Sequence, residues 1–263
     1  MIRISSLSKQ VTLVCGAIWL GVASAGMTQE KVNVSASDPA AAKAGAKAEE
    51  PPVKPTTNPE VQKLLGEAQD LQSRHRYYDA LAKLDEAEKL APKDPNIFNI
   101  RGAIYLVPAV REFDKAKDQF EKASALEPTA LAPKFNLAEL QFVKHSFAEA
   151  EAAFAALLKE YTKLQMPVRH LVAFKILMSQ AEQNKIDEAN KTLKDYFTFM
   201  DDTPAYYFAK AALAFVQKKD DEAKEWLEKA NVIFKSTDNA PYLDSLMETR
   251  HIPNIMFAPS EPK

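Results

Sequence analysis

A recurrence of residue types at intervals of about 34 residues restricts the fold of this chain more than any other feature of its sequence. An alanine returns after 36, 34, 39 and 34 positions, and a large apolar residue follows it four positions later each time. The alanines are Ala80, Ala116, Ala150, Ala189 and Ala223. Because residues four apart share one face of a helix, each unit is predicted to contain an amphipathic helix.

A second small residue stands twelve positions before three of these alanines, at Ala68, Ala138 and Ala211, and Gly102 takes this place in the second unit. Small residues at matched positions allow two consecutive helices to approach closely. Each unit is therefore predicted to be a helix, a short turn and a second helix, and the units to stack in sequence order. The predicted units span residues 59–92, 95–128, 131–164, 168–201 and 204–235.

Several of the predicted helices carry start signals. Asn58-Pro59 and Thr203-Pro204 each place a capping residue before a proline at the first helical position. Ser146 and Glu149 have the spacing of a capping box. We therefore expect the Asn58, Thr203 and Ser146 side chains to accept hydrogen bonds from the first turn of the helices that they precede.

The pattern of residues 59–235 resembles the tetratricopeptide repeat family, whose 34-residue unit carries small residues, an aromatic residue and a closing proline at such offsets. The resemblance implies an all-α right-handed superhelix of about five repeats. The periodic stretch 239–250 is predicted to be a helix that caps the open end of the stack, so the repeat domain spans 58–250. The chain departs from the family at the usual glycine between the helices, where it has His75, Arg111, His145, Asn184 and Lys218.

The first 25 residues have the pattern of a secretory signal peptide: a basic start, a short apolar run and a small-residue end. Residues 26–57, rich in Ala, Lys and Pro, are predicted to be a disordered linker, and residues 251–263 an irregular tail. The mature protein is then exported, to a periplasmic or extracellular location. The alternative is that residues 11–27 are retained as a membrane anchor.

Composition and motifs argue against an enzyme. The chain has six glycines, and none follows Gly102, so no glycine loop for phosphate is expected in the remaining 161 residues. The single cysteine, Cys15, lies in the predicted signal peptide, and the four histidines lack metal-ligand spacing. A formal net charge of −2 gives no indication of nucleic-acid binding. We expect no catalytic residue, no metal and no cofactor.

The resemblance also implies a binding surface, because in that family the first helix of each repeat lines a concave groove that takes an extended peptide or a helix. The positions carried over are Gln62, Gln69, Asn96, Asn99, Phe135, Glu139, Phe142, Phe174, Met178, Phe208 and Phe215. About half of these phenylalanines are expected to pack between repeats instead, since burial is the usual fate of phenylalanine.

These observations predict a non-enzymatic scaffold that binds a peptide or helix of another protein, in the cell envelope or outside the cell. Binding to nucleic acid is not expected, and contact with a membrane is expected only if the N-terminal segment is retained. Two alternatives stay open. One is a membrane-anchored envelope assembly factor, and the other is a carrier of a lipid or a small apolar ligand.

Overall fold

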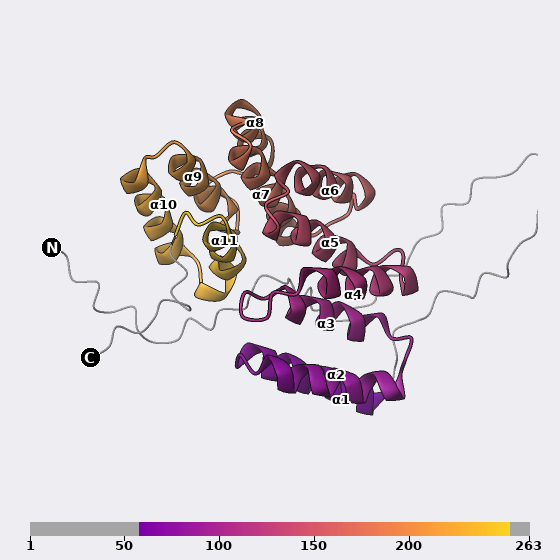
Figure 1. Cartoon of the computed structure of the whole chain (residues 1–263). Coiled ribbons are helices and arrows are strands. Elements are labelled where there is room, and N and C mark those ends of the chain that lie inside the picture. Colours follow the sequence, from indigo (N-terminus) through magenta and orange to yellow (C-terminus); the bar gives the residue numbers. More distant parts are fainter. Residues whose placement is uncertain (1–57, 253–263) are drawn as a thin grey trace, which may run out of the picture.

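The computed structural model describes residues 58–252, and within that range the chain forms eleven helices and no strand (Figure 1). The helices are α1 (Pro59–Ser73), α2 (Tyr77–Leu90), α3 (Pro95–Leu106), α4 (Phe113–Leu126), α5 (Leu131–Val143), α6 (Phe147–Glu160), α7 (Met166–Glu182), α8 (Ile186–Tyr196), α9 (Ala205–Val216), α10 (Asp220–Ile233) and α11 (Ser236–Glu248). The predicted signal peptide, the predicted linker and all but the first two residues of the predicted tail lie outside the described residues.

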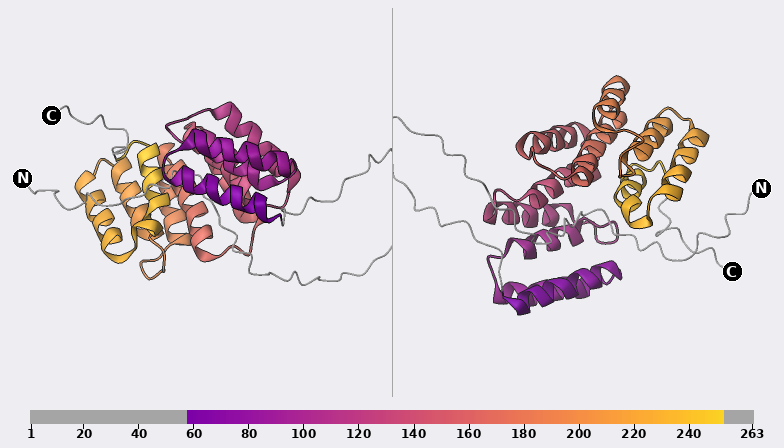
Figure 2. Two further views of the ribbon diagram at one scale, coloured as in Figure 1. Left: turned by 90° about the horizontal axis from the view of Figure 1, so that it is seen from below. Right: turned by 180° about the vertical axis from the view of Figure 1, so that it is seen from behind.

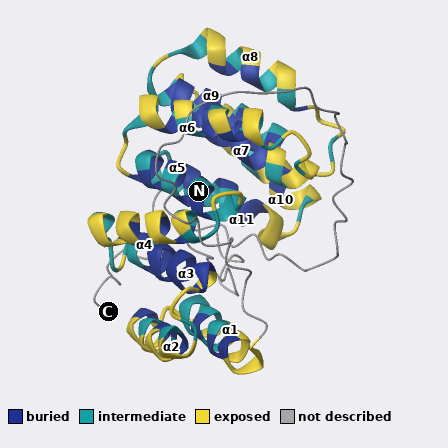
Figure 3. Cartoon of the chain, turned by 90° about the vertical axis from the view of Figure 1, so that its right-hand side faces the viewer, coloured by how far each residue is buried: buried dark blue, intermediate teal, exposed yellow. Residues whose placement is uncertain are grey.

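The first ten helices form five consecutive pairs, and the pairs stack in sequence order (Figures 1 and 2). From unit to unit, α1 contacts α3, α3 contacts α5 and α7 contacts α9. From the second pair on, the odd-numbered helix of each pair is the more buried one, and α8 and α10 bury few residues (Figure 3). The predicted all-α repeat stack is therefore confirmed, with helix pairs that match the predicted units closely.

The recurring small residues lie where the helices approach most closely. All five of the alanines that define the period are completely buried. At Gly102 on α3, a Cβ atom would stand 2.6 Å from the Phe120 ring of α4. Because this distance is far below a van der Waals contact, the absence of a side chain at Gly102 is what allows Phe120 to fill the space between the two helices.

The turns between paired helices keep a left-handed backbone without glycine. His75, His145, Asn184 and Lys218 have φ values of 59–60°, and Arg111 has a φ of 42°. These are the five positions where the sequence departs from the family's glycine. The first helix of each pair therefore ends with a left-handed residue, as helices commonly do. Because these residues are not glycine, each side chain adds conformational strain to its turn.

The helix-start predictions were partly correct. Asn58 caps α1, since its Oδ1 accepts a hydrogen bond from the Glu60 backbone N–H at 3.0 Å. The predictions for Ser146 and Thr203 are wrong: neither side chain makes a capping hydrogen bond, and Pro204 is the N-cap of α9. The Thr203 hydroxyl instead lies 2.7 Å from His170 Nδ1, so the loop before α9 is tied to α7.

The last helix begins three residues earlier than predicted and does more than close the end of the stack. A sixth stacked helix would contact the preceding unit, which is α9 and α10. Helix α11 contacts both of these, but it also packs against α7, which belongs to the unit before (Figure 1). It therefore turns back over part of the face formed by α1, α3, α5, α7 and α9, the first helices of the five pairs, which we call the inner face.

Candidate functional site

At the N-terminal end of the stack, the predicted groove residues are polar, and most of them reach solvent. Gln62 on α1 and Asn96 on α3 are exposed, and Gln69 is half-buried. Asn99 differs, because it is buried and its Oδ1 accepts a hydrogen bond of 2.9 Å from Asn136 Nδ2 of α5. Amide side chains therefore make this end of the inner face polar.

Farther along the stack, the expectation of apolar side chains free on a groove surface is wrong. Phe142, Phe174, Met178 and Phe208 have no exposed surface, and Phe135 is 1% exposed. Phe135 packs on Phe154 of α6, with ring centres 5.2 Å apart. Burial of these side chains extends beyond the half that was expected to pack between repeats.

Helix α11 is the reason for part of this burial. The Tyr242 ring lies between the inner helices α7 and α9, with its centre 5.0 Å from that of Phe174 and 5.3 Å from that of Phe208. Phe215, the last predicted groove residue, is half-buried and stacks on His251, at 5.6 Å between ring centres. The C-terminal part of the predicted groove is thus already occupied by a helix of the same chain.

Glu139, which was predicted to face the groove, takes part in a buried ion pair between neighbouring units. Its Oε1 accepts a hydrogen bond of 2.6 Å from Lys175 Nζ of α7, and both side chains are 3% exposed. Burial raises the pKa of Glu139, and the Lys175 ammonium opposes that rise. The Lys175 ammonium also lies 4.3 Å from the centre of the Phe142 ring.

Two acids of α11 lie close to this pair. Neither carboxyl oxygen of Asp244 has a hydrogen-bond partner among residues 58–252, and burial raises its pKa to about 8. Lys175 lowers the pKa of Asp244, whereas Glu139 and Glu248 raise it. Glu248 itself accepts two hydrogen bonds from Arg111, at 2.8 and 3.0 Å, across 137 residues of sequence.

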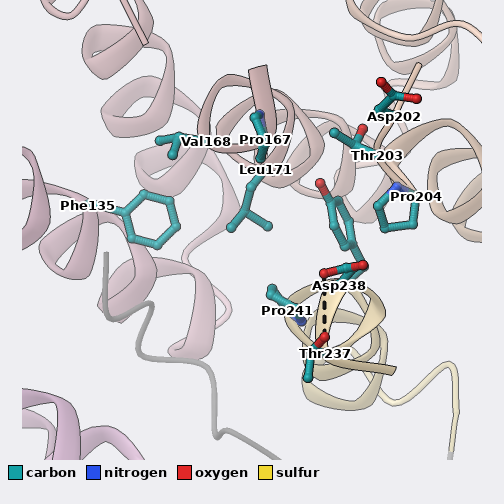
Figure 4. Close-up of a pocket in the computed structure, with 11 residues that line it drawn as sticks. Phe135, Pro167, Val168, Leu171, Asp202, Thr203, Pro204, Thr237, Asp238 and Pro241 are labelled. Atoms are coloured by element: carbon teal, nitrogen blue, oxygen red, sulfur yellow. Dashed lines mark hydrogen bonds between the residues drawn. The ribbon is translucent and has the colours of Figure 1, made fainter. Parts of the chain in front are cut away.

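A cavity of about 320 Å³ remains open at the edge of the inner face, between α5, α7 and the start of α11 (Figure 4). Its walls are mainly apolar, and two carboxylates, of Asp202 and Asp238, lie among its lining residues. The apolar and aromatic side chains that line it are Phe135, Pro167, Val168, Leu171, Pro204, Pro241 and Tyr242, and the two threonines are Thr203 and Thr237.

The cavity lies where the regular stacking of the inner helices is interrupted. Helices α5 and α7 make fewer close backbone contacts with each other than α3 makes with α5 or α7 with α9. The segment between α6 and α7, residues 161–165, belongs to the one step of the repeat that is 39 residues long. The longer step therefore separates two inner helices and leaves room for a side chain from outside.

Exposed apolar residues adjoin the cavity. Met166 precedes Pro167 at the start of α7 and is 50% exposed, and Phe199 and Met200 lie in the loop that leads to Asp202. His170 joins this loop to α7, and burial lowers its pKa, so its imidazole is neutral at pH 7. The edge of the inner face thus combines apolar side chains with acidic groups.

Comparisons with known proteins give a clear fold. No family model and no curated protein matches the chain. Among solved structures, a protein from Thermus thermophilus described as a thermophilic TPR protein matches with a TM-score of 0.55 and 19% identity, over 71% of this chain and 99% of the other. A tetratricopeptide repeat protein from Parabacteroides merdae matches with a TM-score of 0.56 and 15% identity, over 71% of each chain.

The chain has the tetratricopeptide repeat fold. A third solved structure, PilW, described as a widely conserved type IV pilus biogenesis factor, matches with a TM-score of 0.55 and 18% identity, over 74% of this chain and 90% of that one. In a tetratricopeptide repeat stack each unit contacts its neighbours. The contact of α11 with α7, which is not in the neighbouring unit, is an additional one.

The repeat pattern could not have shown the residues that fix α11. Arg111, Lys175, Asp244 and Glu248 lie in different units or outside the repeats, and their spacing in the sequence has no regularity. The 39-residue step was the one available sign of an irregular inner face. Over residues 58–252, no group of three His, Cys, Asp or Glu side chains is placed to hold a metal ion, and no helix is long and apolar enough to cross a membrane.

Proposed function

We propose that this protein is a non-enzymatic scaffold that binds a segment of another protein on its inner face. The observation that carries the proposal is the apolar cavity between α5, α7 and α11, on a preformed stack of helices. A rigid surface loses little conformational entropy when a partner binds, so modest apolar contacts suffice for useful affinity. The amide side chains of Gln62 and Asn96 are exposed farther along the same face and make it polar there.

The cavity suits a large apolar side chain of the partner with a basic residue beside it. Its volume of about 320 Å³ and its lining by Val168, Leu171 and Tyr242 favour the apolar group. The exposed carboxylates of Asp202 and Asp238 favour a neighbouring Lys or Arg. Arginine is the better match, because its planar guanidinium binds a carboxylate through two hydrogen bonds.

We place the protein outside the cytoplasm, in the periplasm or beyond the cell. This part of the proposal rests on the signal-peptide pattern of residues 1–25. PilW is described as a pilus biogenesis factor, and its likeness to this chain concerns the fold. N-terminal sequencing of the exported protein tests the location: a start near Gly26 supports it, and a retained Met1 supports the membrane-anchored alternative.

A matched pair of substitutions tests the binding site. Val168→Glu places a charge at the cavity, whereas Val232→Glu places one on α10, where the side chain is 86% exposed and does not line the cavity. We expect Val168→Glu to abolish recovery of the protein that co-purifies with the wild type, and Val232→Glu to preserve it. Equal circular dichroism spectra would show that both variants fold. Equal recovery by both variants would contradict the assignment of the site.

The cavity also favours a second candidate, a carrier of a small apolar ligand, because its apolar walls would accept a hydrocarbon group. Native mass spectrometry of the protein purified from its own host distinguishes the two. A bound species of a few hundred daltons that Val168→Glu removes would favour the carrier, and a protein partner in its place would favour the scaffold.

A further inference from the structure

Helix α11 is held on the inner face by contacts with the second, fourth and fifth units. Glu248 binds Arg111, in the turn after α3 of the second unit. Lys175 of the fourth unit attracts the Asp244 carboxylate, and Glu139 of the third unit repels it. Tyr242 packs between the fourth and fifth units. The helix therefore occupies the inner face as a bound partner helix would.

The apolar anchors of α11 follow the spacing of a helical ligand. Tyr242 is 4% exposed and Leu246 is completely buried, and the two are four residues apart on one side of the helix. Helices that bind in grooves are recognised through apolar side chains at such intervals. Beyond the anchors, His251 Nε2 lies 2.5 Å from Glu182 Oε1 at the end of α7.

The docking of α11 includes an unfavourable contact. Both carboxyl oxygens of Asp244 are buried without a hydrogen-bond partner in the described range, near two more carboxylates, Glu139 and Glu248. Lys175 is the cation that faces it from α7, but this ammonium already donates to Glu139 at 2.6 Å. Since release of α11 would return the Asp244 carboxyl to water, the burial of this group favours the undocked helix.

We propose that α11 is a reversible occupant of the inner face, and that the protein's partner is an amphipathic helix that replaces it there. Such a helix carries an aromatic and an aliphatic residue four positions apart, as Tyr242 and Leu246 are, and has no acid at the position of Asp244. The inference rests on the proposed function, because it names the kind of segment that the inner face takes. The walls that α5 and α7 give the cavity, with Phe135, Val168 and Leu171, remain when α11 leaves, and the lining residues of α11 leave with it.

Hydrogen exchange of the full chain at pH 7 tests whether α11 opens by itself. We expect the amides of α11 to exchange at least ~10-fold faster than those of α7 and α9. Glu248→Gln removes the charge that holds Arg111 and should raise the α11 rate a further ~10-fold. Asp244→Asn removes the unfavourable carboxyl and should lower it. Glu86→Gln, which alters an exposed ion pair with Lys83 on α2, is the control. It should leave the exchange rates of α11, α7 and α9 unchanged.

A labelled synthetic peptide of residues 236–252 tests the replacement itself. We expect it to bind the Glu248→Gln chain about 10-fold more tightly than the wild type, and the Asp244→Asn chain more weakly, because the chain's own helix competes with it. Exchange of α11 at the same rate as α7 in all variants would overturn the proposal, and so would equal peptide affinity for all of them. Neither result depends on the co-purification experiment with Val168→Glu, so the two proposals fail separately.

Discussion

At the scale of single residues, the packing of each helix pair depends on side chains that are small or absent. Gly102 shows this most directly, because a Cβ atom there would stand 2.6 Å from the Phe120 ring. Phe120 is completely buried, so it has little freedom to move aside. A methyl group at this position therefore has no space available.

Gly102→Ala should therefore lower the free energy of unfolding by about 1–3 kcal/mol, the usual cost of overpacking. The other described glycine is a matched control, since a Cβ atom at Gly66 would meet nothing within 4 Å. Gly66→Ala on α1 should raise stability by about 0.5–1 kcal/mol through helix propensity. Urea unfolding of both variants checks this, and the same sign of change for both would contradict the packing argument.

The buried Asp244 carboxyl gives a prediction about pH. Its pKa is raised from 3.8 to about 8 in the folded protein, so the folded state binds the proton more tightly than the unfolded state does. The contribution of this group is then fully favourable below about pH 4 and is lost as pH rises toward 8. Asp244→Asn should make the protein more stable than the wild type by roughly 2 kcal/mol at pH 8, and by less as the pH falls.

Thermal or urea unfolding of the two proteins between pH 4 and pH 9 measures that difference. Taking the difference removes the contribution of His170, whose pKa is lowered by burial and which acts in the opposite direction in the acid range. A difference that does not change with pH would contradict the burial of an ionisable Asp244.

At the scale of single residues, the sequence predicts some positions and leaves others open. The alanine positions were predictable, because one residue type recurs at one interval. The fate of Phe174 and Phe208 was not, because their burial depends on Tyr242, which lies outside the repeats and has no counterpart in them. The repeat pattern specifies the face of the helix on which a phenylalanine lies, and it leaves open what covers that face.

At the scale of the element, the turns between helices retain a left-handed residue where the resembling family has glycine. Lys218 has a φ of 59° and is exposed, so its side chain adds strain without making a buried contact. Lys218→Gly should stabilise the protein by about 1 kcal/mol. Lys144 has a φ of −77°, so Lys144→Gly should destabilise by about 0.5–1 kcal/mol. Denaturant midpoints measure both changes, and a loss of stability in Lys218→Gly would contradict the argument.

The last helix illustrates what an element's own sequence contains. Its periodicity was enough to predict a helix over 239–250, close to the observed α11. Its position in the fold was predicted less well, because Tyr242, Asp244 and Glu248 interact with residues that are distant in the sequence. Arg111 is 137 residues from Glu248. Contacts at that separation depend on the curvature of the whole stack, which no local pattern contains.

At the scale of the whole molecule, a linear stack should transmit a local defect only to its neighbours, except where α11 connects distant units. Leu84 of the first pair and Leu177 of the fourth are both completely buried. Leu84→Ala should cost about 2–4 kcal/mol and increase hydrogen exchange in α1 and α2 while α7 and α9 stay protected. Leu177→Ala should increase exchange from α5 to α11. The same exchange profile for both variants would show a single cooperative unit instead.

The most direct test of the central claim, that a partner binds the inner face, is photocrosslinking in the native host. A photoreactive residue replaces Gln62, Asn96 or Val168 on the inner face, or Asp118 or Glu188, which are exposed on α4 and α8. The account predicts that the three inner positions capture the same protein and that the two outer positions do not capture it. Capture from Asp118 and Glu188 but from none of the inner positions would contradict it.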